Sequence, residues 1–137
     1  MKAKGKGKGI TLIEVLIATV ILVFASLSII QFYIYSLRLS QSNKEEVLAS
    51  DQLANMMEAI KCTPFNNLLT DFPDGVVDGL PANDYSAILG GYALNNEEIT
   101  VSYVNASSNP LEVTAALSWQ DFRGAIRTKY LVTKRVR

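Results

Sequence analysis

The most pronounced hydrophobic pattern in the chain is an apolar run near its N-terminus. Residues 15–37, VLIATVILVFASLSIIQFYIYSL, are 23 residues without a charged side chain. As an α-helix they would extend roughly 34 Å, slightly more than the roughly 30 Å hydrocarbon core of a bilayer. The run therefore predicts a membrane-spanning helix. Lysines among residues 1–9 favour a cytoplasmic N-terminus with the C-terminal part outside.

Beyond Arg38 the pattern takes on helical periodicity. No proline interrupts the sequence before Pro64, so the helix is predicted to run from about Thr11 to Ala59 or Ile60. Apolar residues follow one another at the spacing of a single helical face: Ala49, Leu53, Met56 and Ile60. This face is expected to require a covering layer.

The last third of the chain changes to a period of two. Residues 63–96 are rich in Pro, Gly, Asn and Asp and predict a connecting region with little regular structure. Residues 97–134 then predict three antiparallel strands with short loops. Their alternating positions are Ile99, Val101 and Tyr103; Leu111, Val113, Ala115, Leu117 and Trp119; and Ile126, Thr128, Tyr130 and Val132. The expected fold class is α+β, with a long N-terminal helix packed on a small C-terminal antiparallel sheet.

One carboxylate, Glu14, interrupts the start of the apolar run. An acidic side chain at the centre of a membrane helix costs roughly 2.5–3.5 kcal/mol, and less near the interface. Lys8 lies six positions upstream, and Arg38 lies at the far end of the run, so neither is placed to neutralise it. The partner is expected to come from elsewhere, and a free amine created by cutting the chain before Ile10 would be suitable.

The stretch KGITLIEVLIATVIL, from Lys8 onward, resembles the class III signal and helix start of type IV pilins and type II secretion pseudopilins. The resemblance implies cleavage by a prepilin peptidase between Gly9 and Ile10, followed by N-methylation of Ile10. Glu14 would become the fifth residue of the mature chain. In this family the acid pairs with the N-terminal amine of a neighbouring subunit during assembly.

The resemblance also implies partners and an organisation of the chain. The partners are the peptidase, other pilins or pseudopilins bound through the N-terminal helix, an inner-membrane assembly platform, and lipid before assembly. The expected parts are a basic leader over 1–9, a transmembrane or filament-core helix over 10–37, an amphipathic half over 38–62 and a head over 63–137. The usual pilin proline in the apolar half is missing, as is more frequent among minor subunits.

The C-terminal stretch LEVTAALSWQDFRGAIRTKYLVT, residues 111–133, resembles the final hairpin of PilV-like minor pilins and of the I-type pseudopilin. The resemblance rests on Ser118-Trp119, Gly124 and the tail around Tyr130. It is the less specific of the two, because a strand with a tryptophan is common.

The amino-acid composition limits the kinds of catalytic and metal-binding site that the chain can form. The chain has no His, one Cys, and 13 Lys+Arg against 13 Asp+Glu. Histidine-based zinc sites, Ser-His or Cys-His catalysis and an internal disulfide are therefore excluded. We expect no enzymatic activity, no cofactor, no metal and no small-molecule substrate. A nucleic-acid-binding domain is disfavoured as well, since such domains are usually basic.

Three weaker candidate sites lie between residues 62 and 98. Cys62 is predicted to be a small packing residue, with an intermolecular disulfide as the alternative. The acids of residues 71–78 suggest calcium only faintly, because the EF-hand spacing is absent. Glu97 and Glu98 are neighbours whose side chains point to opposite faces, so they are expected to begin a strand in solvent rather than share a site.

These observations favour a minor pilin of a type IV pilus that enters or primes the filament. The alternatives are an I-type pseudopilin of a type II secretion system and a single-pass membrane protein that does not polymerise. For either filament protein the expected location is the bacterial inner membrane, followed by the pilus or pseudopilus.

Overall fold

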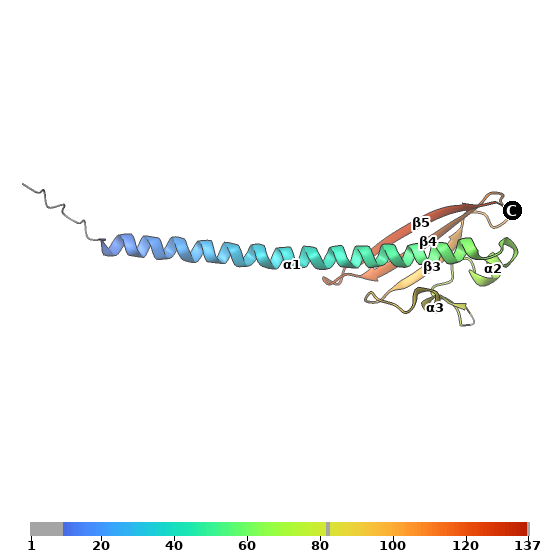
Figure 1. The fold of residues 1–137 in the computed structure, drawn as a ribbon, viewed down its shortest axis with the longest axis horizontal. Coiled ribbons are helices and arrows are strands. Elements are labelled where there is room, and N and C mark those ends of the chain that lie inside the picture. Colours follow the sequence, from blue (N-terminus) through green and yellow to red (C-terminus); the bar gives the residue numbers. More distant parts are fainter. Residues whose placement is uncertain (1–9, 82, 137) are drawn as a thin grey trace, which may run out of the picture. The chain divides into compact units, whose positions relative to one another are not determined.

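The computed structural model describes residues 10–81 and 83–136, so the leader 1–9, with Gly9, lies outside the described residues. The elements are α1 (Leu12–Cys62), η1 (Phe65–Asn67), α2 (Leu68–Asp71), β1 (Gly79–Leu80), β2 (Asn83–Asp84), α3 (Tyr85–Leu89), β3 (Glu98–Tyr103), β4 (Leu111–Gln120) and β5 (Ile126–Arg135). Figure 1 labels the helices α1, α2 and α3 and the strands β3, β4 and β5. β3, β4 and β5 form an antiparallel sheet in this order. The expected α+β fold is confirmed.

The chain divides into two compact units, Met1–Ser40 and Gln41–Arg137. In the first unit α1 is a single helix on which every described residue, from 10 to 40, is exposed. Three hydroxyl groups in its apolar run bond within the helix: Thr19 donates to the carbonyl of Leu16 at 2.8 Å, Ser26 to the carbonyl of Leu22 at 2.8 Å, and Ser28 to the carbonyl of Phe24 at 2.9 Å. Because these hydroxyl donors already have acceptors, the apolar surface around them can contact lipid or other helices.

The second unit, which we call the head, contains the hydrophobic core. The second half of α1 contributes the predicted stripe, and Ala49, Leu53, Met56 and Ile60 are fully buried. β4 alternates buried and half-buried residues along its whole length, as its period of two predicts. The helix continues to Cys62, slightly beyond the predicted end, and stops before Pro64, since the residue preceding a proline disfavours the helical conformation.

The connecting region is more ordered than predicted, because residues 63–96 contain short helices and the β1–β2 hairpin. Tyr103 ties this region to the sheet: its hydroxyl donates to the carbonyls of Phe72 at 2.7 Å and Leu68 at 3.3 Å. Burial raises the pKa of Tyr103, so the hydroxyl stays protonated as a donor.

β5 departs from the simple alternation in one respect. Its register places Arg127 opposite Trp119, Lys129 opposite Leu117 and Arg135 opposite Leu111, so the strand turns a mostly polar face toward α1. The apolar positions Ile126, Tyr130 and Val132 therefore lie on the outer face and are exposed.

The polar face of β5 binds the helix directly. Arg135 donates to the carbonyls of Ile60, at 3.2 Å, of Lys61, and of Thr63, at 2.9 Å. Lys129 donates to Ser50 Oγ at 2.7 Å. Arg135 thus satisfies carbonyls at the C-terminus of α1, where a cation is also favoured by the helix dipole.

Candidate functional site: the start of the apolar helix

The first turn of α1 is built by Thr11 and Glu14. Glu14 Oε2 accepts hydrogen bonds from the Thr11 backbone N–H at 2.9 Å and from Thr11 Oγ1 at 3.0 Å. In return, the Glu14 N–H donates to Thr11 Oγ1 at 3.4 Å. This reciprocal arrangement is a capping box, which satisfies donors that the start of a helix leaves free.

The capping box was not expected from the sequence. Two donors of Thr11 hold one oxygen of Glu14. The structure does not test the positively charged partner that Glu14 is expected to find in another chain. The spacing T-x-x-E at residues 11–14 is the sequence signal of this box and is visible in the sequence. Thr11 is therefore the site residue that sequence reasoning missed.

The box supplies hydrogen bonds but no positive charge. Among residues 10–81 and 83–136, the ion pairs are Arg127 with Asp121 and Lys134 with Glu112, and neither involves Glu14. Glu14 is thus an oriented carboxylate without a described counter-ion. An apolar groove of about 500 Å³ lies beside it, lined by Ile10, Glu14, Val15, Ala18, Thr19 and Leu22.

The two remaining predicted site positions are at the same end of the helix. Gly9 lies outside the described residues, and Ile10, the first described residue, is 78% exposed. The structure thus brings Ile10, Thr11 and Glu14 together within one turn. It does not test cleavage or methylation.

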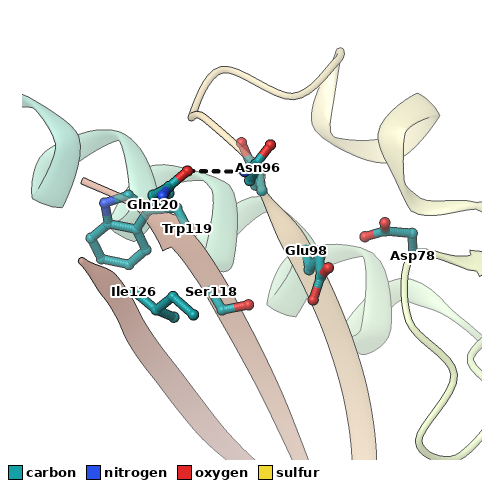
Figure 2. Close-up of a pocket in the computed structure, with 8 residues that line it drawn as sticks. Asp78, Asn96, Glu98, Ser118, Trp119, Gln120 and Ile126 are labelled. Carbon is teal, nitrogen blue, oxygen red and sulfur yellow. Dashed lines mark hydrogen bonds between the residues drawn. The ribbon is translucent and has the colours of Figure 1, made fainter. Parts of the chain in front are cut away.

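The head contains a polar pocket of about 450 Å³ over the outer side of the sheet (Figure 2). Asp78, Asn96, Glu98, Ser118, Trp119, Gln120 and Ile126 are labelled among its lining residues in Figure 2. Asn96 Nδ2 donates to Gln120 Oε1 at 3.0 Å, and Asp78 Oδ1 accepts from the Ile99 N–H at 2.9 Å. These bonds are structural, and the described part of the chain holds no group of three or more acidic, Cys or His side chains arranged for a metal ion.

Two expectations about the head are wrong. Cys62 is exposed rather than packed, because it lies at the helix end outside the buried stripe. Glu97 is 6% exposed rather than solvated. Its Oε2 accepts from the N–H groups of Ala93 at 3.0 Å and Leu94 at 2.9 Å, so this one oxygen is satisfied inside the head.

No protein-family model matches the chain, and no curated protein or solved structure is significantly similar to it. The chemistry of its surface is the remaining guide to function. Within the described residues, α1 is the helix that is long and apolar enough to cross a membrane, which makes it a candidate membrane anchor.

Proposed function

We propose that the chain is a minor pilin subunit of a type IV pilus. A prepilin peptidase would cut it between Gly9 and Ile10, Ile10 would be N-methylated, and the subunit would wait in the inner membrane with its head outside. The observation that carries the proposal is the carboxylate of Glu14, which Thr11 orients and which has no counter-ion among residues 10–81 and 83–136, at the start of an apolar helix half whose residues 10–40 are all exposed.

The helix surface supports assembly by helix packing. An exposed apolar helix of this length is stable in lipid but must be covered by other helices once it leaves the membrane. In the head, the buried apolar stripe of α1 begins at Ala49.

Glu14 supports a defined register for that packing. Cleavage before Ile10 would create an amine, and the amine of a neighbouring subunit would neutralise the Glu14 carboxylate in an apolar surrounding. Thr11 would meanwhile hold the carboxylate in place. Removing one partner of a buried ion pair leaves an uncompensated charge, so a misplaced subunit would be disfavoured. The interaction therefore contributes specificity as well as attraction.

The proposal is tested by locating the protein in its source cells. A minor pilin is expected in sheared surface filaments, at a low ratio to the main subunit, and deletion of its gene should reduce piliation. Absence from surface filaments together with lost protein secretion in the deletion strain would instead identify an I-type pseudopilin. Recovery only in membranes, with both piliation and secretion intact, would leave the non-polymerising anchor.

A further inference from the structure

The two edges of the three-stranded sheet differ in what covers them. The outer edge of β3 is occupied by residues 74–78. The N–H groups of Gly75 and Asp78 donate to the carbonyls of Val101 and Ile99, each at 2.8 Å. The carboxylate of Asp78 accepts from the Ile99 N–H at 2.9 Å. This edge has little capacity left for another strand.

The edge of β5 is open. In an antiparallel pair, residues alternate between those bonded to the neighbour and those facing away. The Asp121 N–H donates to the Ala125 carbonyl at 2.9 Å, which makes Arg127 and every second residue after it face β4. The backbone groups of Ile126, Thr128, Tyr130, Val132 and Lys134 therefore face outward. No backbone hydrogen bond from another described segment reaches them.

The side chains along this edge suit a strand partner. Ile126 is 79% exposed, Tyr130 67% and Val132 49%, and all three lie on the outer face of the sheet. β5 has ten residues, so a partner strand could pair over roughly 33 Å. Main-chain hydrogen bonds would provide affinity, and the exposed apolar side chains would provide contact area.

Charge selects the kind of partner. Residues 123–137 contain six Lys or Arg and no acid, whereas residues 10–122 contain three bases and all 13 acids. Among the described residues, only Arg127 and Lys134 of this basic segment form ion pairs, leaving Arg123, Lys129 and Arg135 without an acidic partner. An acidic strand would therefore be attracted, and a basic one repelled.

A second copy of this chain does not meet the requirement. Pairing β5 with itself would place two strands side by side that each carry Arg127, Lys129, Lys134 and Arg135 and no acid. The other strands offer no alternative within the described residues, because β3 is covered, β4 is central, and β1 and β2 have two residues each. The partner must be another polypeptide.

We propose that the outer edge of β5 binds an extended, acidic segment of a different polypeptide by strand addition. The proposal goes beyond filament assembly and does not depend on it. A subunit with this edge would carry a second protein on its outward head. The test accordingly needs no filament.

The test uses the full chain in discs of neutral phosphatidylcholine. The probe is a fluorescent peptide of the length of β5 in which glutamate alternates with valine, and a matched peptide has lysine in place of glutamate. We expect the acidic peptide to bind about tenfold more tightly than the basic one. Amide hydrogen exchange of Thr128, Tyr130 and Val132 should slow by about tenfold on binding.

Proline variants localise the binding. Thr128→Pro with Val132→Pro removes two outward N–H donors and leaves the bonds to β4 intact, because prolines are tolerated on strand edges. The double variant should bind the acidic peptide about tenfold more weakly, whereas the matched Thr128→Ala with Val132→Ala keeps the donors and should bind normally. Exchange protection of Val113 and Ala115 in β4 verifies that the proline variant is folded.

Several results would overturn the proposal. If both peptides bind equally well, the basic residues of β5 do not select an acidic partner. Binding that ignores the prolines would place the peptide elsewhere, for example on the lysines of residues 1–9. Protection of the Thr128 and Val132 amides by rising protein concentration alone would identify a second copy as the partner. Protection by anionic phosphatidylglycerol vesicles without peptide would identify a lipid surface.

Discussion

The two halves of α1 are one continuous helix with opposite relationships to their surroundings. Residues 10–40 expose every side chain, although they are the most apolar part of the chain. Residues 41–62 are more polar, yet they bury Leu53 and Met56 completely in the head. Apolar content alone therefore does not show where a core forms. A core forms where a covering layer exists, and within the head the sheet covers the second half of α1.

The largest expected effect is a difference in unfolding free energy between one substitution in each half of α1. Leu53→Ala removes a fully buried side chain and should lower the free energy of unfolding of the head by about 2–5 kcal/mol. Leu27→Ala, at a side chain that is 51% exposed in the first half, should change it by less than about 0.5 kcal/mol. Urea unfolding in micelles, followed by Trp119 fluorescence, measures both. Equal losses of unfolding free energy in the two variants would show that the two halves of α1 do not differ in this way.

The next prediction concerns Glu14, whose substitution should reduce incorporation into filaments without changing the stability of the head. Glu14→Gln keeps an oxygen that can accept the Thr11 bonds but removes the charge. Because the charge is needed for pairing, the ratio of filament to membrane protein should fall about tenfold in Glu14→Gln, and by as much in Glu14→Ala, while the head unfolds normally in both variants. Quantitative immunoblots of sheared filaments give the ratio.

Thr11 provides the control for the same assay. Thr11→Ser preserves the hydroxyl and should assemble nearly as well as the wild type, whereas Thr11→Val loses the hydroxyl bond to Glu14. Normal incorporation of Glu14→Gln together with failure of Thr11→Val would show that the cap, and not the charge, is required.

A smaller effect should appear where β5 binds the end of α1. Arg135→Met keeps much of the aliphatic stem but removes the donors to the carbonyls of Ile60, Lys61 and Thr63, and should cost the head about 1–3 kcal/mol. Lys134→Met is the matched control, because its ion pair with Glu112 is exposed and such pairs contribute about 0–1 kcal/mol. The same urea unfolding compares the two, and equal costs would contradict the capping role.

The smallest effect depends on pH and involves the turn between β4 and β5. Although burial alone would raise the pKa of Asp121, hydrogen bonds from the N–H groups of Ala125 and Arg123 and from the Arg127 side chain hold it below its ordinary value. Its stabilising contribution is therefore complete above the unfolded pKa of about 3.9 and is lost as pH falls through the folded value.

Asp121→Asn tests this dependence. The Tm of the head should be lower in the variant at neutral pH, and the difference from the wild type should shrink only below about pH 4. Trp119 fluorescence again follows the head during heating. A difference that shrinks already between about pH 7 and pH 5 would contradict the lowered pKa.

Much of the fold could be predicted because its signals are periodic. The stripe from Ala49 to Ile60 and the alternation of β4 each match what the sequence indicates. The face of β5 was harder to assign, because both of its faces contain apolar and polar residues, and only the register that places Arg127 opposite Trp119 decides between them. Strand register depends on contacts distant in sequence.

At the candidate site, the sequence indicates Glu14 but not the hydrogen-bonded turn that surrounds it. Glu14 is conspicuous because its charge interrupts an apolar run. Thr11 is uncharged and less conspicuous, and its role as a cap depends only on the T-x-x-E spacing at residues 11–14. The predicted exposure of Glu97 and Cys62 was wrong because burial depends on the surrounding structure. Whether an acid is buried depends on backbone donors such as those of Ala93 and Leu94, and loop geometry brings these donors into place.

The most direct test of the central claim is the mass of the N-terminal peptide, measured separately in sheared surface filaments and in membranes. The account predicts a peptide that begins at N-methylated Ile10 in the filaments. An N-terminal peptide that still carries residues 1–9, with the bond between Gly9 and Ile10 intact, in both fractions would contradict this prediction and would favour a simple membrane anchor.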